Sequence, residues 1–248
     1  MARTVPSSYQ QQASRAFGQL VRGINDAQLR ALMRAVFYRA GRYQAFCQAP
    51  LAATGADACA GSAIRHAIRS GRLLRAVAGS FAPQTRDLML AATLLMGVGA
   101  IEAFEAQGSP RLTPRGRLYP VAVLSTLIVH DVRCTIDRNK REALEGLILR
   151  AAAFAGEPGV PAPEELGAGE FLQHEGRVVA LCVQLDRFAE TAQPASLAVR
   201  WSQPTSERRS AQRGTATLRQ QPAPHLTLVG QRRKEDDDNT IEPRLAAG

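Results

Sequence analysis

Apolar residues recur at helical spacing through the first 190 residues of this chain, in stretches separated by segments rich in Gly and Pro. In residues 26–40 these positions are Leu29, Leu32, Met33, Val36 and Phe37, with Asp26 ahead of them as a candidate N-cap. Similar spacing predicts further helices over residues 62–78, 83–104, 116–134, 137–154 and 168–191, with breaks at 49–61, 107–115 and 156–167. The pattern predicts an all-α fold.

Composition agrees with this fold class and bounds the number of domains. The 248 residues are 45% hydrophobic but only 5% aromatic, and Ala is abundant, which favours close helix packing over a β-sandwich. We expect a flexible N-terminus over residues 1–19, one helical domain over 20–193, and a disordered Arg-rich tail over 194–248. The tail carries an acidic block, KEDDDNTIEPRLAAG, and one apolar segment, HLTLVG, which could dock as a strand.

Membrane and cofactor classes find no support in the sequence. The longest apolar run, residues 88–101, is shorter than the roughly 20 residues that a bilayer span needs. The first residues lack the apolar segment of a secretory signal, so we expect a cytoplasmic protein without membrane contact. The cysteines show no C-x-x-C pairing and are expected to be buried free thiols, with no metal or other cofactor: Cys47, Cys59, Cys134 and Cys182.

Positive charge is concentrated in the first third of the chain. The net charge is +9, and residues 1–80 hold 11 arginines against two acidic residues. Arg-rich helix faces neutralise phosphates, so nucleic acid is a candidate partner. A coding bias toward Arg would give the same excess without a function, since only Lys140 and Lys234 are lysines. The expected phosphate contacts are Arg22, Arg30, Arg34, Arg39, Arg42, Arg65, Arg69, Arg72 and Arg75.

Two segments, RDLMLAATLLMGVGAIEAF (86–104) and GRLYPVAVLSTLIV (116–129), resemble the central stretch of the HD-domain metal-dependent phosphohydrolases. The closest resemblance is to the type found in YhaM-like 3′-to-5′ exoribonucleases. Four more segments resemble the family in the same order, so that the similarity covers roughly residues 20–190: INDAQLRALMRAVFYRAGRYQAFCQAPLAAT, GSAIRHAIRSGRLL, LEGLILRAAAFAGEPGVPAPEE and VVALCVQLDRF. The resemblance implies an all-α bundle in which His and Asp side chains hold one or two divalent metals.

Carried over position by position, the resemblance implies that the metal site is lost. The family's first metal histidine falls on His66, which is present. The other ligand positions hold residues without suitable donors: Met96 and Gly97 for the His-Asp pair, Val121 for the next histidine, Ala151 and Ala152 for a later histidine pair, and Val183 for the final aspartate. Asp186 remains near the last position in a supporting role at most. We therefore expect no catalytic residue, and a catalytically inactive HD-like domain.

Such a domain would act by binding. The partner would be nucleic acid, bound through the Arg-rich helices, or another protein of a mobile-element or nucleic-acid-processing system. In a related alternative, the tail recruits a protein partner while the bundle serves as an anchor.

A second hypothesis keeps the enzyme class. His130 and Asp131 also follow an apolar run, and with His66 and Asp186 they could form the ligand set of an active metal-dependent HD phosphohydrolase or nuclease. Against this, an exposed His at the C-terminal end of a helix is common and is mildly favoured by the helix dipole. His66 alone could equally be a core histidine with a hydrogen-bond partner.

Overall fold

The computed structural model describes residues 7–39, 41–105, 109–166 and 172–192 of the chain. The chain divides into two units, Met1–Gln203 and Pro204–Gly248, and the second lies entirely outside the described residues. The predicted tail, residues 194–248, and its HLTLVG segment therefore fall outside the described part, and everything below concerns the first unit.

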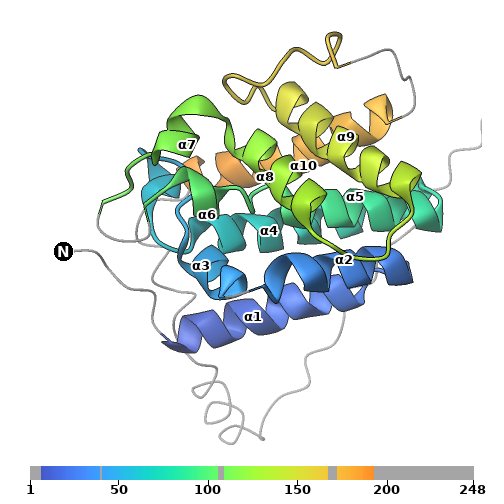
Figure 1. Ribbon diagram of the computed structural model, residues 1–248, viewed down its shortest axis with the longest axis horizontal. Coiled ribbons are helices and arrows are strands. Elements are labelled where there is room, and N and C mark those ends of the chain that lie inside the picture. The colour runs from blue at the N-terminus through green and yellow to red at the C-terminus, as the bar shows by residue number, and fades with distance from the viewer. Residues whose placement is uncertain (1–6, 40, 106–108, 167–171, 193–248) are drawn as a thin grey trace, which may run out of the picture. The chain divides into compact units, whose positions relative to one another are not determined.

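The described residues are all-α, as predicted, and contain no strand (Figure 1). The α-helices are α1 (Ser7–Arg22), α2 (Ala27–Phe37), α3 (Arg42–Gln48), α4 (Ser62–Val77), α5 (Pro83–Leu95), α6 (Ala100–Ala103), α7 (Pro114–Leu118), α8 (Val121–Asp131), α9 (Arg138–Phe154) and α10 (Gln173–Ala192). Two 3-10 helices, η1 (Ala56–Ala58) and η2 (Ala78–Ser80), lie in the connections. None of the described helices combines the length and apolar character that crossing a bilayer requires.

Helix starts follow the capping residues of the sequence. The side chain of Asp26 accepts a hydrogen bond from the Leu29 backbone N–H at 2.9 Å, which confirms the predicted cap of α2. Asp137 caps α9 in the same way, by accepting from Lys140 N at 3.0 Å. Each cap satisfies a backbone N–H that the first helical turn leaves without a partner.

Residues 7–22 form helix α1, so the prediction of a flexible segment over residues 1–19 does not hold from Ser7 onward, and residues 1–6 lie outside the described part. Ala13, Phe17 and Leu20 recur at helical spacing and are 5% exposed or less. The Phe17 ring meets the Phe37 ring edge-on at 5.1 Å, which joins α1 to α2. The start of α1 is polar and rich in Gln, so its composition does not indicate the apolar stripe.

The predicted helix over residues 83–104 is also wrong in part, because α5 ends at Leu95 and α6 is a separate short helix. A Cβ added at Gly99 would lie 2.2 Å from the Val121 carbonyl oxygen, so only glycine allows α8 to approach this closely. Ser125 Oγ of α8 accepts from Gly99 N at 2.8 Å and lies 2.8 Å from the Met96 carbonyl oxygen. The chain therefore turns at residues 96–99, where α8 begins beside it.

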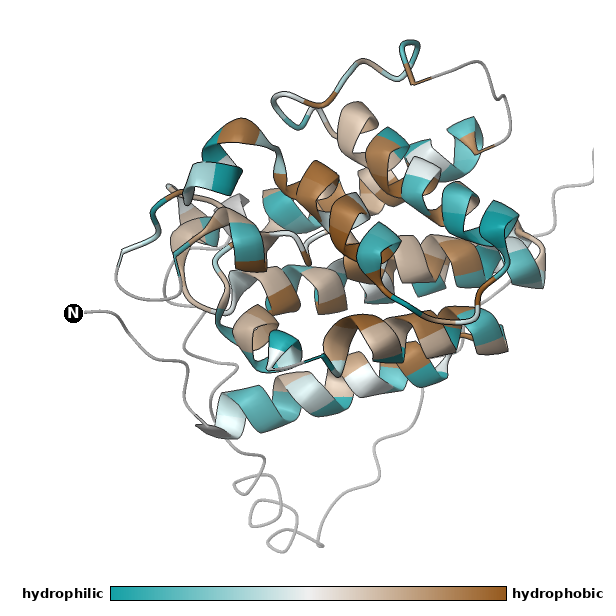
Figure 2. Cartoon of the chain, in the orientation of Figure 1, coloured by the Kyte–Doolittle hydropathy of each residue, from teal (hydrophilic) through white to brown (hydrophobic). Residues whose placement is uncertain are grey.

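α5 is the central helix, as its apolar character predicts, and it packs against α4, α9, α10 and α2. In Figure 2, α8 and much of α5 carry the brown of hydrophobic residues. The buried carboxylate of Asp87, 6% exposed, accepts from Asn25 N at 2.9 Å and from Asp26 N at 2.8 Å. This polar contact ties the start of α5 to the turn between α1 and α2.

α4 and α10 run antiparallel, since residue 66 meets residue 186 and the Phe81 ring stacks on His174 at 5.3 Å. Their buried faces include Ile64, Leu74, Val179 and Val183. Five apolar residues that helical spacing assigns to the core are exposed instead: Leu73, Val77, Leu181, Leu185 and Phe188. They extend the apolar stripe of each helix beyond the part that its neighbours cover.

The prediction of buried free thiols is confirmed for Cys47 and Cys182, which are free and buried. It is wrong for Cys59, which is exposed, while Cys134 is partly buried. Cys59 lies in the short connection just before α4, where no helix covers it.

Candidate functional site

A cavity of about 300 Å³ lies where α4, the α5–α6 turn, the start of α8 and α10 meet. Its lining residues come from seven segments of the chain: Leu51 and Ala52, Asp57, His66, Met96 and Gly97, Val121, Glu157 and Pro158, and Val183 with Arg187. Five of the seven positions to which the HD resemblance assigns metal ligands line this one cavity, although the segments that carry them span more than 100 residues of sequence. The other two, Ala151 and Ala152, are fully buried in α9 and are not among the lining residues.

His66 is held in the cavity wall by a buried charged network. Its Nδ1 lies 2.6 Å from Asp186 Oδ2, and Arg69 Nε donates to Asp186 Oδ1, also at 2.6 Å. Asp186 is 2% exposed and His66 is 9% exposed. Because Asp186 engages Nδ1, Nε2 is the ring nitrogen left for any other partner. The structure thus brings together two of the four residues of the enzyme hypothesis, His66 and Asp186.

The other two residues of that hypothesis lie elsewhere. His130 and Asp131 are at the C-terminal end of α8, whereas the cavity is at its start, so nine residues of helix place them roughly 14 Å away along the axis. The His130 side chain is 71% exposed, and its Nδ1 lies 3.4 Å from Glu145 Oε1. Its position at an exposed helix end matches the non-catalytic interpretation of the sequence.

Three charged residues of the cavity were missed by the sequence interpretation: Asp57, Glu157 and Arg187. Glu157 Oε1 accepts from Ala122 N at 3.1 Å and so caps the start of α8. Burial raises the pKa of Glu157, an effect that this backbone hydrogen bond and the nearby charge of Arg187 reduce. Within the described residues, Asp57 Oδ1 and Arg187 Nε are buried without a hydrogen-bond partner. Asp57 and Arg187 were missed because their segments are far apart in sequence and meet only in the folded chain.

This donor set does not fit the divalent metal that the HD resemblance implies. Tight metal sites use three or more nitrogen or oxygen ligands with oriented supporting groups. Among the residues that the structure describes, no group of three or more His, Cys, Asp or Glu side chains is placed to hold a metal. Val121 and Val183 put hydrocarbon into the cavity wall, and Arg187 puts a positive charge there.

The arginines predicted to contact phosphate divide into two groups in the structure. Four of them make internal contacts: Arg30, Arg65 and Arg69, described next, and Arg42, described below. Arg30 Nη1 donates to the Ile24 and Asn25 carbonyl oxygens at 2.5 Å and 2.7 Å, which closes the α1–α2 turn. Arg69 pairs with buried Asp186, and Arg65 Nη2 lies 2.8 Å from Cys59 Sγ. These three are half-buried.

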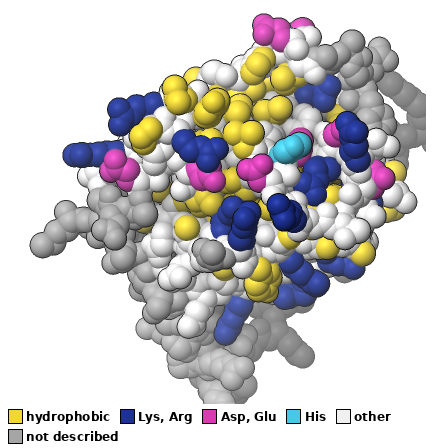
Figure 3. Space-filling view, in the orientation of Figure 1, with side chains coloured by type: hydrophobic (Ala, Val, Ile, Leu, Met, Phe, Trp, Pro, Cys, Tyr) yellow, Lys and Arg dark blue, Asp and Glu magenta, His cyan; other side chains and the backbone are white. Residues whose placement is uncertain are grey.

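Six exposed arginines from the described part of residues 1–80 lie on three adjoining parts of the fold and are here called the basic surface: Arg15 and Arg22 of α1, Arg34 of α2 with Arg39 just after it, and Arg72 and Arg75 of α4. α1 packs against both α2 and α4. A Cβ added at Gly23 would lie 3.6 Å from Arg75 Nη1, so Arg75 reaches the end of α1 beside Arg22. Figure 3 shows Lys and Arg side chains gathered where α1 and α2 lie in Figure 1.

Few acidic groups oppose this surface. Neither α1 nor α4 contains an acidic residue, and the carboxylate of Asp26 is already held by Lys140 Nζ at 2.6 Å. Of the predicted arginines, Arg42 is the fourth with an internal contact: it is half-buried and donates to the Val36 carbonyl oxygen at 3.2 Å. Arg15 was missed because the segment that carries it was predicted to be flexible.

No family model matches this chain, and neither does any curated protein or solved structure.

Proposed function

We propose that this chain is a catalytically inactive, HD-like helical module that binds nucleic acid through the basic surface. The observation that carries the binding role is the set of six exposed arginines on α1, α2 and α4, with no acidic residue in α1 or α4. Phosphate attraction to such a surface is strong and independent of base sequence.

Arginine spacing on these helices suits a phosphate backbone. Arg15 and Arg22 are seven residues apart on α1, so they share one face at about 10 Å separation along the axis. Arg72 and Arg75 are three residues apart on α4 and also share a face. The surface therefore offers paired guanidinium groups on two packed helices, and guanidinium groups bind phosphate oxygens with two donors at once.

The inactive character of the module is supported by the cavity. The convergence of His66, Met96, Gly97, Val121 and Val183 on one space is what an HD-like bundle with lost ligands would produce. His66 keeps a carboxylate partner, but the described residues around it do not supply a metal ligand set. The enzyme alternative requires His130 and Asp131 at this cavity, and they lie at the far end of α8.

The test measures binding of the full chain to fluorescein-labelled DNA and RNA, single-stranded and duplex, by anisotropy over a range of KCl concentrations. We expect the double variant Arg72→Glu with Arg75→Glu to weaken binding at least about tenfold. The magnitude of the slope of log affinity against log salt should fall by about 1.8 on duplex DNA, or about 1.4 on a single strand, if both side chains contact phosphate. Thermal melting should be unchanged, because both side chains are exposed.

A matched control carries the same change in net charge elsewhere. Arg111 and Arg117 are exposed on the segment around α7, so Arg111→Glu with Arg117→Glu should leave binding within about twofold of wild type. Equal losses in both double variants would reduce the effect to net charge and contradict the assigned surface. Absence of any binding by wild type would overturn the proposal. Manganese-dependent cleavage of an oligonucleotide that is lost in His130→Ala would restore the enzyme hypothesis.

A further inference from the structure

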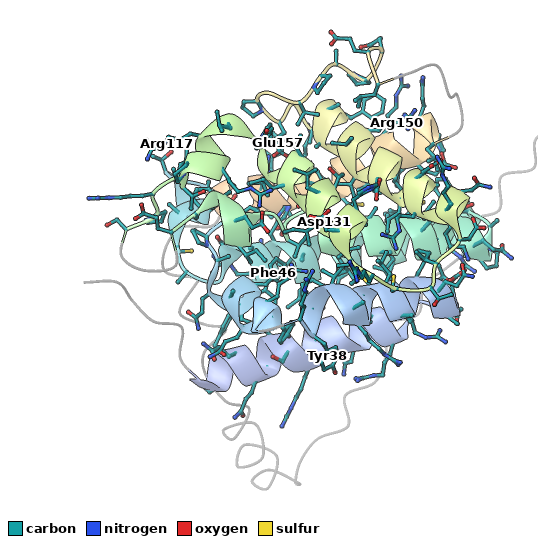
Figure 4. The ribbon with its side chains drawn as sticks, in the orientation of Figure 1. Tyr38, Phe46, Arg117, Asp131, Arg150 and Glu157 are labelled. Atoms are coloured by element: carbon teal, nitrogen blue, oxygen red, sulfur yellow. The ribbon has the colours of Figure 1, made fainter. Side chains whose placement is uncertain are left out.

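Tyr38 is the most exposed large apolar side chain among the described residues, at 86%. Phe37, the preceding residue, is 6% exposed and packs its ring 5.3 Å from Phe46 and 5.9 Å from Tyr43. An aromatic cluster that could shelter another ring is thus beside Tyr38, but Tyr38 stays outside it. Figure 4 shows Tyr38 on the α1–α2 side of the bundle, away from Glu157 and the cavity.

The backbone at Tyr38 is ordered by the end of α2. Its N–H donates to the Arg34 carbonyl oxygen at 2.8 Å, and its φ and ψ of −80° and −3° continue the helical conformation. An exposed ring on a fixed backbone loses little conformational entropy when it stacks on a flat partner. The side chain is therefore suited to a contact rather than to packing within this chain.

Two exposed arginines flank Tyr38 along the chain. Arg34 lies one helical turn before it and Arg39 follows it, and both are exposed. Arg42 is close enough to Arg39 that this charge adds to the effect of burial in lowering the Arg42 pKa, while Glu102 and Asp131 act in the opposite direction. Like charges held together at the surface favour an anionic partner.

We propose that Tyr38 stacks on a base of single-stranded nucleic acid whose flanking phosphates bind Arg34 and Arg39. This inference rests on the proposed function and names its partner class. A duplex presents only base edges in its grooves, whereas a single strand presents base faces, which stack on exposed aromatic rings. Arg and Tyr are also enriched in protein interfaces, so the choice of nucleic acid rests on the positive charge of the basic surface to which Arg34 and Arg39 belong.

The experiment compares a 12-nucleotide single strand with a duplex of the same sequence, using the full chain and anisotropy. Tyr38→Ala should weaken single-strand binding roughly 5- to 150-fold, the equivalent of about 1–3 kcal/mol for one stacked base, and leave duplex binding within about twofold. Tyr38→Phe should retain wild-type affinity because the ring is kept. The control Tyr119→Ala removes another exposed ring, 44% exposed after α7, and should have no effect.

A second series identifies stacking directly. Single strands that carry an abasic site at successive positions should bind wild type more weakly at one or two positions, and Tyr38→Ala should be insensitive to all of them. Equal losses of single-strand and duplex binding in Tyr38→Ala, or no loss at all, would overturn the stacking role. In the first case the phosphate-binding proposal still stands if Arg72→Glu with Arg75→Glu weakens binding. Tyr38-dependent self-association in sedimentation, without nucleic acid, would assign the ring to a second copy of the chain instead.

Discussion

The two halves of α4 carry arginines at similar spacing and put them to opposite uses. In the first half, Arg65 and Arg69 are half-buried, and almost all of the residues around them in the helix are buried. Arg69 pairs with Asp186. In the second half, Arg72 and Arg75 are exposed, as are Leu73 and Val77 beside them. The difference teaches that residue type and helical spacing do not determine a charge's role. The neighbouring helix does.

α10 supplies that neighbour for the first half. It brings a carboxylate that is 2% exposed against His66 and Arg69, and a buried charge must be paired to be tolerated. The second half of α4 meets α1 at Gly71, where an added Cβ would lie 3.2 Å from Leu20 Cδ1, and α1 has no acidic residue. Its arginines therefore keep their charge available to solvent or to a ligand.

The largest expected effect is on the buried half. Asp186→Ala leaves Arg69 and His66 without their buried partner and should lower the free energy of unfolding by about 3–5 kcal/mol. Denaturant titration followed by circular dichroism measures this. Asp131→Ala, at the exposed end of α8, is the control and should change stability by less than about 0.5 kcal/mol. A stable Asp186→Ala protein would mean that the network does not hold the two helices together.

Arg69→Gln sharpens the comparison between the halves. It removes one of the two partners of Asp186 and should cost about 1–3 kcal/mol of stability while leaving nucleic-acid affinity nearly unchanged. Arg72→Gln should do the reverse, with stability within about 0.5 kcal/mol of wild type and weaker binding. Melting curves and anisotropy on the same two proteins measure both quantities. If the two variants behaved alike, the division of α4 would be wrong.

The smallest expected effect is a pH dependence of the stability of the fold. It arises from Glu157, which lines the same cavity as His66 in the buried half of α4. Burial raises the pKa of Glu157 above 4.5, so the folded chain binds this proton more tightly than the unfolded chain does. Its contribution to stability is therefore lost as pH rises from 4.5 through the folded pKa. Glu157→Gln keeps an oxygen for Ala122 N, and its stability relative to wild type should increase between pH 4 and pH 7.5. An equal difference at both pH values would contradict this.

Local pattern was sufficient for most helices. The cap at Asp26, the helix at 62–78 that became α4, and the helix at 137–154 that became α9 follow from residues within a few positions of each other. The prediction of where helices end was wrong where a segment distant in sequence packs against the chain. α5 stops at Leu95, and α8 approaches the chain at Gly99. Gly97 and Gly99 permit a close approach there, but the local sequence does not identify the helix that approaches.

The residues of the candidate sites likewise divide into those that the sequence indicates and those that only the folded structure shows. The Arg excess of the first third is visible in the sequence. Of the seven positions that the resemblance assigns to one site, His66, Met96, Gly97, Val121 and Val183 line the cavity, whereas Ala151 and Ala152 do not. Asp57, Glu157 and Arg187 were not predicted, because each reaches the cavity from a segment whose position depends on several packed helices.

The order of amino acids alone determined where helices form and where positive charge accumulates, since both depend on residues close together in the chain. Folding then selected which arginines remain in solvent, which one meets Asp186, and which side chains share a cavity. The physical reason is that burial and charge pairing act between residues far apart in sequence, as Arg69 and Asp186 are.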